Sequence, residues 1–298
     1  MAYKTPDFTE RTAAARAAKQ RALDKSRDSR SQSRKGRGRR ASRGSQGSRG
    51  TAQARADRGR AQGCPRRALR RAEGAQALTP RESVDSADVP GGAPLRLVRH
   101  GTDYIIMLER NELMNSRMSG SEAALGTMTC DRLATRDSPR ILIGGYGMGF
   151  TLRAVLATLG ARAQIVVAEL VPQIISWARG PMEALTDNCL DDPRVDIVID
   201  DVATVMTEGG YDAILLDVDN GPDGVTRPAN DGLYTPHGLA KARAALKPKG
   251  ILAVWSAGAD AAFARRLGQA GFAVEEVRIR ARANGKGPLH FLWFATRR

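Results

Sequence analysis

The segment at residues 140–153 is the feature that most constrains how this chain can fold. It begins with the apolar run Ile141–Ile143, continues into a helical pattern, and carries glycines between the two, at Gly145, Gly147 and Gly149. Glycine lets a strand turn sharply into a helix and lets the backbone approach a ligand closely. A strand, a Gly-x-Gly-x-Gly turn and a helix in this order predict a unit that binds a nucleotide or nucleoside.

An acidic residue follows this unit where a nucleoside-binding protein needs one. The next apolar run, residues 165–168, ends at Glu169. An acid that ends the second strand of such a unit accepts hydrogen bonds from ribose hydroxyls. A glycine signature alone is weak, but here it occurs together with its strand, its helix and its acid. The combination predicts a nucleoside-binding site.

Strands and helices are predicted to alternate through most of the remaining chain. Two short strands are expected at 95–98 and 104–108, and a helix capped by Ser119 or Ser121 runs toward Leu133. Later strands are predicted at residues 195–199, 213–216, 251–255, 273–277 and 290–294, with helices from Val171, Pro236 and Ala259. Alternation of this kind predicts a doubly wound, mostly parallel α/β sheet with helices on both faces.

The last strand is expected to run against the others. Residues 284–287 form an Asn-Gly-Lys-Gly turn between the final two strands, which predicts a hairpin. One antiparallel strand at the end of an otherwise parallel sheet is typical of the class I methyltransferase variant of the Rossmann fold. We therefore expect that domain at residues 139–298, preceded by a short β element and linking helix at 91–138.

The first 90 residues have a different composition from the rest. They contain 23 Lys and Arg against 9 Asp and Glu, which accounts for +14 of the chain's net charge of +15. From residue 26 the segment is mainly Arg, Ser, Gly, Ala and Gln, too polar to offset its ordering entropy, so residues 1–90 are expected to be a disordered tail. Such a tail can attract polyanions nonspecifically, or be a solvated extension, or result from a misassigned reading frame.

The cysteines and histidines give no metal-binding pattern. Cys64, Cys130 and Cys189 are far apart and odd in number, and the three histidines are scattered. We therefore expect no metal and a reducing, cytoplasmic compartment. No apolar run is long enough for a bilayer span, so no membrane contact is expected.

Further polar residues follow the third and fourth predicted strands of the sheet. In open parallel sheets, ligands bind outside the carboxyl ends of the strands. Asp201 and Val202 follow the third strand, where an acid and a backbone N–H can contact adenine, although Asp201 is equally a good helix cap. Asp217 follows the fourth strand and can orient a cationic amine and take its proton; the alternative is a turn carboxylate.

At these positions the chain resembles the spermidine synthase (aminopropyltransferase) family. The resemblance rests on residues 140–153, on Val-Val-Ala-Glu169, on the Pro-Arg-Val segment leading to Asp201, on Tyr-Asp-Ala-Ile-Leu-Leu-Asp217, and on Leu-Tyr-Thr at 233–235. It implies that Glu169 holds the ribose, that Asp201 holds the adenine, and that Asp217 holds the attacking amine. The implied group donor is decarboxylated S-adenosylmethionine or S-adenosylmethionine, with a small amine as acceptor, and a homodimer is compatible with the resemblance.

The chain departs from the family pattern at several charged positions. Met148 replaces the aspartate of the glycine motif, Asn220 replaces an aspartate after the fourth strand, and residues 115–117 align with the family's Tyr-His-Glu. Arg117 is expected to repel a diamine there, and the family's N-terminal β domain is expected to be reduced to two strands. Loss of one charged hydrogen bond costs about 1.5–3 kcal/mol.

Three functions are compatible with the sequence. The first is aminopropyl transfer to an amine in polyamine biosynthesis, with Asp217 as the catalytic residue and with Gly145, Gly147, Gly149, Glu169, Asp201 and Val202 binding the donor. The second is S-adenosylmethionine-dependent methyl transfer to another acceptor. The third is a noncatalytic protein whose basic tail contacts nucleic acid. Retention of all three site acids favours an enzyme, and the first function is preferred.

Overall fold

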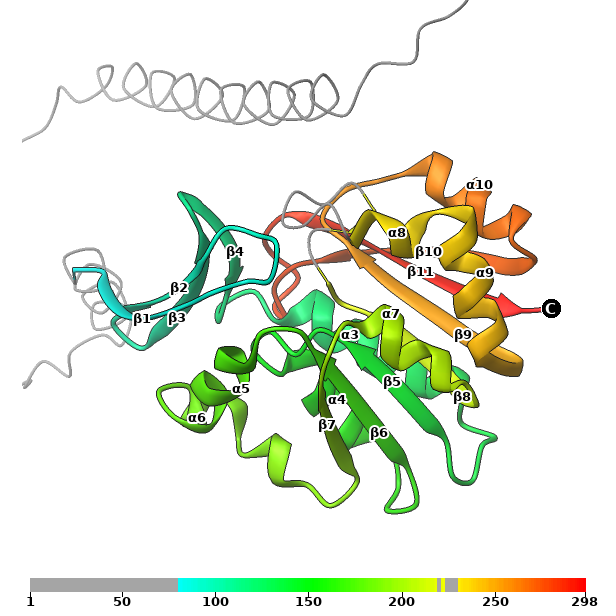
Figure 1. The fold of residues 1–298 in the computed structure, drawn as a ribbon, viewed down its shortest axis with the longest axis horizontal. Coiled ribbons are helices and arrows are strands. Elements are labelled where there is room, and N and C mark those ends of the chain that lie inside the picture. The colour runs from blue at the N-terminus through cyan, green and yellow to red at the C-terminus, as the bar shows by residue number, and fades with distance from the viewer. Residues whose placement is uncertain (1–79, 219–220, 223–229) are drawn as a thin grey trace, which may run out of the picture. The chain divides into compact units, whose positions relative to one another are not determined.

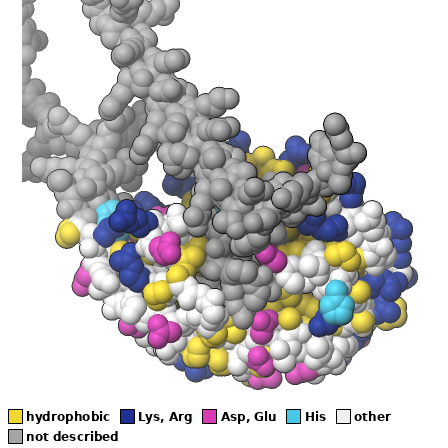
Figure 2. Space-filling view, turned by 45° about the horizontal axis from the view of Figure 1, so that its top comes forward, with side chains coloured by type: hydrophobic (Ala, Val, Ile, Leu, Met, Phe, Trp, Pro, Cys, Tyr) yellow, Lys and Arg dark blue, Asp and Glu magenta, His cyan; other side chains and the backbone are white. Residues whose placement is uncertain are grey.

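Two β-sheets with flanking helices make up the computed structural model, which describes residues 80–218, 221–222 and 230–298 (Figure 1). Most of the predicted tail, residues 1–79, lies outside the described residues, as does Asn220. No described helix has both the length and the apolar composition of a membrane span. Figure 2 shows basic and acidic side chains interspersed on the visible face of the described part, consistent with the nearly balanced charge of residues 91–298.

The larger sheet has seven strands in the order β10-β11-β9-β8-β5-β6-β7. In chain order these strands are β5 (Arg140–Gly144), β6 (Gln164–Glu169), β7 (Val195–Ile199), β8 (Tyr211–Leu216), β9 (Leu246–Ser256), β10 (Phe272–Arg280) and β11 (Leu289–Arg297). Strands β5 to β9 are parallel, whereas β11 is antiparallel to both of its neighbours. The predicted fold and its antiparallel last strand are confirmed.

Helices cover both faces of this sheet because its strands are apolar on both sides. One face packs against α3 (Gly120–Arg132), α4 (Phe150–Thr158) and α5 (Pro172–Arg179), and the short α6 (Glu183–Thr186) follows α5. The other packs against α7 (Val202–Val205), α8 (Asp231–Tyr234), α9 (Pro236–Ala245) and α10 (Ala261–Gln269). Ile141 and Ile143 belong to the first core and Leu142 to the second, as alternation along a strand requires.

The smaller sheet has more strands than the sequence predicted. It has four antiparallel strands in sequential order: β1 (Glu82–Ala87), β2 (Leu95–His100), β3 (Asp103–Leu108) and β4 (Asn111–Asn115). The expectation of two strands was wrong, and order begins before Leu95. Strand β1 lies within the predicted tail. Its sequence, Glu-Ser-Val-Asp-Ser-Ala, has too little apolar content to predict a strand. Its pairing with β2 stabilises it instead.

The two sheets share one hydrophobic core. Leu97 and Ile106 of the small sheet belong to the same buried cluster as Ile143 and Trp177 of the larger domain. The indole N–H of Trp177 also donates to Asp85 Oδ2 of β1 at 2.7 Å. The small sheet is therefore packed against the first face of the large one, and it lies beside the carboxyl ends of β5 and β6.

Candidate active site

The glycine turn after β5 is formed as the sequence predicts. Gly145, Gly147 and Gly149 have φ of 84°, 57° and 75°, values that side chains with a Cβ rarely adopt. A Cβ on Gly145 would lie 2.7 Å from the backbone oxygen of Asp217, so this position also needs the missing side chain. Gly149 is the N-cap residue of α4. The turn therefore brings backbone from β5 against the end of β8.

Glu169 holds this turn to the neighbouring strand. Its Oε2 accepts a hydrogen bond from the Tyr146 backbone N–H at 2.9 Å, and its Oε1 accepts one from the Val171 N–H at 2.9 Å. Burial raises the pKa of Glu169, while the backbone N–H groups around it lower it. The acid that the sequence assigned to ribose thus also fixes the glycine turn and the start of α5.

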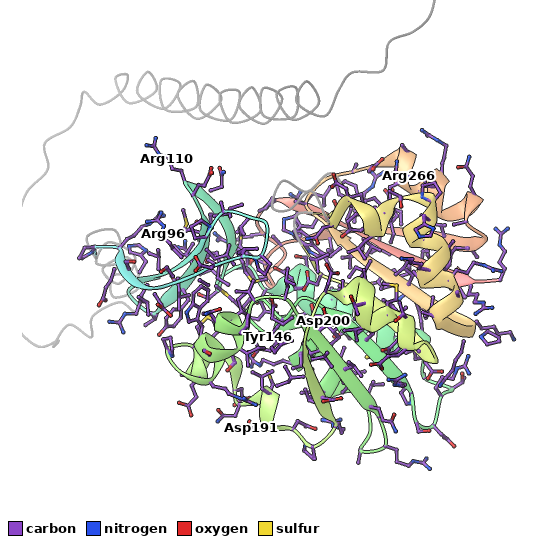
Figure 3. The ribbon with its side chains drawn as sticks, in the orientation of Figure 1. Arg96, Arg110, Tyr146, Asp191, Asp200 and Arg266 are labelled. Carbon is purple, nitrogen blue, oxygen red and sulfur yellow. The ribbon has the colours of Figure 1, made fainter. Side chains whose placement is uncertain are left out.

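A cavity lies at the carboxyl ends of the strands, where the order reverses between β5 and β8. Figure 3 labels Tyr146, after β5, and Asp200, after β7, at this edge of the sheet. Most of the predicted site residues line the cavity: Gly145, Gly147, Glu169, Asp201, Val202 and Asp217. Gly149, the N-cap residue of α4, is not among the lining residues.

The cavity combines an acidic side with an apolar side. Its carboxyl groups are Glu122, Glu169, Asp200, Asp201 and Asp217, and no Lys, Arg or His is among the described residues that line it. The small sheet and the loop before it supply the apolar side chains of Val89, Leu95, Ile106, Leu113 and Met114. Five carboxyl groups without a basic partner in the described lining favour a cationic ligand over an anionic one.

Asp217 lies at the end of β8 with its carboxyl group held in place. The Thr151 hydroxyl of α4 donates a hydrogen bond to Asp217 Oδ2 at 2.7 Å. Burial raises the pKa of Asp217 to about 6, although the hydrogen bond from Thr151 lowers it. Asp217 is therefore fixed at the cavity wall and titrates near neutral pH.

Glu122 is a site residue that the sequence analysis treated only as part of a helix start. It lies on α3, is buried, and lines the cavity. Burial and the nearby charge of Asp217 raise the pKa of Glu122 to about 8. A usable signal was its spacing, since Glu122, Leu125 and Thr129 follow an i, i+3, i+7 pattern that puts the acid on the buried face of the helix.

Two further buried polar groups adjoin Glu122. The Ser121 hydroxyl donates to Glu122 Oε2 at 2.6 Å and lies 2.8 Å from Nδ1 of His290 on β11. The His290 ring packs edge-on against Trp255, with ring centroids 4.7 Å apart. Trp255 lines the cavity, and its buried Nε1–H has no hydrogen-bond partner in the structure.

Asp201 has the helix-capping role that the sequence offered as an alternative. It is the N-cap of α7, and its Oδ1 accepts a hydrogen bond from the Ala203 N–H at 2.9 Å. A carboxylate has lone pairs beyond those that one N–H uses, so a cap at the cavity wall can still contact a ligand. Capping and ligand contact are therefore compatible at Asp201.

Two of the family departures lie away from the cavity. Met148 is fully buried in the core and is not a lining residue. Arg117 pairs with Asp103 at 3.4 Å and is not among the lining residues either. The repulsion of a diamine by Arg117 stays a prediction, and the structure adds that Arg117 is paired with Asp103 of the small sheet. Among the described residues, no group of His, Cys, Asp and Glu side chains is arranged to hold a metal ion.

The chain is similar to curated polyamine aminopropyltransferases over part of its length. It is 35% identical over 127 residues to the enzyme of Mycobacterium tuberculosis, covering 41% of this chain and 23% of that protein. It is 32% identical over 149 residues to polyamine aminopropyltransferase 1 of Streptomyces coelicolor, covering 47% and 27%. The chain thus spans about a quarter of the length of these relatives. No protein-family model matches it.

Solved structures show the same fold. Spermidine synthase from Thermotoga maritima superposes with a TM-score of 0.57 at 18% identity, covering 72% of this chain and 73% of that one. A spermidine synthase in complex with the transition-state analogue AdoDATO gives 0.57 at 17% identity, with 72% of each chain covered. These identities are low, so the likeness concerns the arrangement of strands and helices.

Proposed function

Because the chain is spermidine synthase-like, we propose that it transfers an aminopropyl group from decarboxylated S-adenosylmethionine to a small amine, as in polyamine biosynthesis. The observation that carries the proposal is the charge of the cavity. Five carboxyl groups line it without a basic side chain among the described lining residues. The donor, the acceptor amine and the polyamine product are all cations, so each is attracted by the ionised acids and favours ionisation of those whose pKa is raised.

The same charge distinguishes between the two forms of the donor. S-adenosylmethionine carries a carboxylate beside its amino group, whereas the decarboxylated form carries only the sulfonium and the ammonium. A ligand carboxylate in this cavity would face Glu122, Asp217 and their neighbours without a cationic partner from the described lining. Desolvating an unpaired charge is costly, so the decarboxylated donor fits better.

The nucleoside part of the donor has suitable partners at the strand ends. Glu169 is the acceptor for ribose hydroxyls, and Asp201 with the backbone of Val202 is the contact for adenine. The positive φ angles of Gly145 and Gly147 let the backbone approach the ligand.

The transfer needs an amine that has lost a proton. The acceptor ammonium gives a proton to a carboxylate, and the neutral nitrogen attacks the methylene carbon beside the sulfonium. A C–N bond forms, the C–S bond breaks with its electrons going to sulfur, and a neutral thioether leaves. Asp217 holds and orients the amine, because the Thr151 hydrogen bond fixes its carboxyl group at the cavity wall.

Met148 does not weaken this proposal as strongly as the sequence suggested. Its side chain is in the core, so the aminopropyl ammonium group is not forced against an apolar surface at that position. Acids from other elements are available, since Glu122 and Asp217 both line the cavity. We assign the charge that the family takes from its glycine motif to these two residues.

The direct test is calorimetric titration of the full chain with each form of the donor, followed by a transfer assay with short diamines. We expect decarboxylated S-adenosylmethionine to bind at least ten-fold tighter, which corresponds to about 1.4 kcal/mol. The Glu183→Gln variant, which changes an exposed acid of α6, serves as a matched control. Tighter binding of S-adenosylmethionine would refute the proposal and favour methyl transfer.

A further inference from the structure

We propose that Glu122 is a second catalytic residue, which receives the proton that the acceptor amine loses before it attacks. This role rests on the aminopropyl transfer proposed above and names the proton acceptor within it. Asp217 then remains ionised and holds the amine, while Glu122 performs the proton transfer. Holding the amine and accepting its proton are thus divided between two carboxyl groups.

The position of Glu122 supports this assignment. Its side chain reaches the cavity from α3, whereas Asp217 reaches it from the end of β8, so the two acids come from different elements to one cavity. Both residues contact Thr151. Its hydroxyl donates to the Asp217 carboxyl group and lies 3.1 Å from the Glu122 backbone oxygen. Thr151 thus fixes the two acids relative to each other.

A hydrogen-bond chain orients Glu122 to accept a proton. When Glu122 is ionised, the Ser121 hydroxyl donates to Glu122 Oε2 and is not available to donate to His290, so His290 donates from Nδ1 to the Ser121 oxygen in that state. Burial lowers the pKa of His290 to about 4, which keeps its ring neutral and able to hold this tautomer. The chain stabilises the ionised form of Glu122 and leaves its other oxygen for the ligand.

The groups around Glu122 leave it in the right range for a base. Asp217 after β8 is the charge that acts on it, while His290 of β11, Thr151 of α4 and Trp255 of β9 are neutral neighbours. Glu169, Asp200 and Asp201 are the other carboxyl groups that line the cavity. An alkyl ammonium has an ordinary pKa of about 10.

Matching to the amine favours Glu122 over Asp217. Burial and the neighbouring Asp217 charge raise the pKa of Glu122 toward that of the ammonium, whereas the hydrogen bond from Thr151 opposes the rise in the pKa of Asp217, so Glu122 has the higher proton affinity of the two. Glu122 is therefore the more effective proton acceptor of the two. Asp217, with the lower proton affinity, is the better permanent anion.

The test compares Glu122→Gln, Glu122→Asp and the control Glu183→Gln in the full chain, with decarboxylated S-adenosylmethionine as donor and putrescine as acceptor. Glu122→Gln is expected to lower kcat, measured at saturating donor and acceptor, by about 10²–10⁴-fold. Glu122→Asp should restore part of the rate, and the control should match the wild type. A Glu122→Gln variant that keeps a third or more of the wild-type kcat overturns the proposal.

The pH profile gives a readout that a structural role does not move. The Ser121 hydroxyl lowers the pKa of Glu122, so Ser121→Ala should shift the rise of kcat/KM with pH to more alkaline values. An unshifted profile in a folded Ser121→Ala variant contradicts the hydrogen-bond chain. This variant also keeps the inference testable if Glu122→Gln does not fold.

Carbon-13 NMR of the side-chain carboxyl groups separates this inference from the proposed function. In the free protein, a signal absent from Glu122→Gln should titrate near pH 8, and Asp217→Asn should lower its pKa by removing the neighbouring charge. A wild-type chain that transfers no aminopropyl group refutes the proposed function. The catalytic role of Glu122 is then refuted as well, even if its carboxyl signal titrates near pH 8. Active wild type with a Glu122 signal titrating near pH 4.5 refutes the inference alone.

Discussion

Glu169 offers the sharpest test of how the site is built, because its carboxyl group supports the glycine turn as well as facing the cavity. Glu169→Ala removes the acceptor of two buried backbone N–H groups, those of Tyr146 and Val171. A buried donor left without a partner costs about 1–3 kcal/mol, so the variant should lose about 2–5 kcal/mol of unfolding free energy. Glu169→Gln keeps one acceptor oxygen and should lose about half as much.

The measurement is urea unfolding of both variants and of Glu183→Ala, a truncation of an exposed acid that should change stability by less than about 0.5 kcal/mol. Donor binding is then measured by calorimetry at a temperature where Glu169→Ala is folded. We expect binding to be lost in Glu169→Ala even there, since the ribose acceptor is gone. A loss of stability below about 1 kcal/mol would show that the turn does not depend on this carboxyl group.

Three further predictions concern stability. The pKa of Glu122 is about 4.5 in the unfolded chain and about 8 in the folded one, so the free energy of unfolding falls as pH rises between these values. The unfolding free energy of Glu122→Gln should therefore exceed that of the wild type by about 2–4 kcal/mol at pH 8 and by little at pH 4.5. Urea unfolding at both pH values measures the difference. Gly145→Ala combines a φ of +84° with a contact to the Asp217 backbone and should cost at least about 2 kcal/mol, measured by thermal unfolding; an unchanged midpoint would contradict the observed turn. Asp212→Ala removes the acceptor of the Arg140 backbone N–H and the partner of the half-exposed Lys247, and should cost about 1–3 kcal/mol in urea, mainly from the N–H; retained stability would mean that this carboxyl group is dispensable.

The large domain could be predicted from sequence because its elements carry local signals. The apolar run at residues 141–143, the glycines after it and Glu169 each have a fixed place in a nucleoside-binding unit, and the order of strands and helices follows from them. The hairpin turn at 284–287 likewise identified the antiparallel last strand. These features depend on neighbours within a few residues, which a single sequence displays.

The small sheet and the second acid could not be found in the same way. Strand β1 is stabilised by its pairing with β2 and by the contact of Asp85 with Trp177, a residue 92 positions away. Glu122 becomes a site residue only because α3 packs beside the end of β8, where Asp217 lies. The ion pair of Arg117 with Asp103 has the same origin, because alignment to a family motif cannot show it. Long-range packing decides each of these cases.

The division of the cavity into an acidic side and an apolar side means that its chemistry and its size selection are encoded in different stretches of the chain. The acids lie on α3 and at the strand ends of the large sheet, whereas Leu113 and Met114 come from β4. Exchanging these two side chains for smaller or larger ones alters the room for an acceptor without touching a charged group. Under the proposed function, substitutions in this one short strand can therefore change the length of acceptor that fits without changing the acids that act in the reaction.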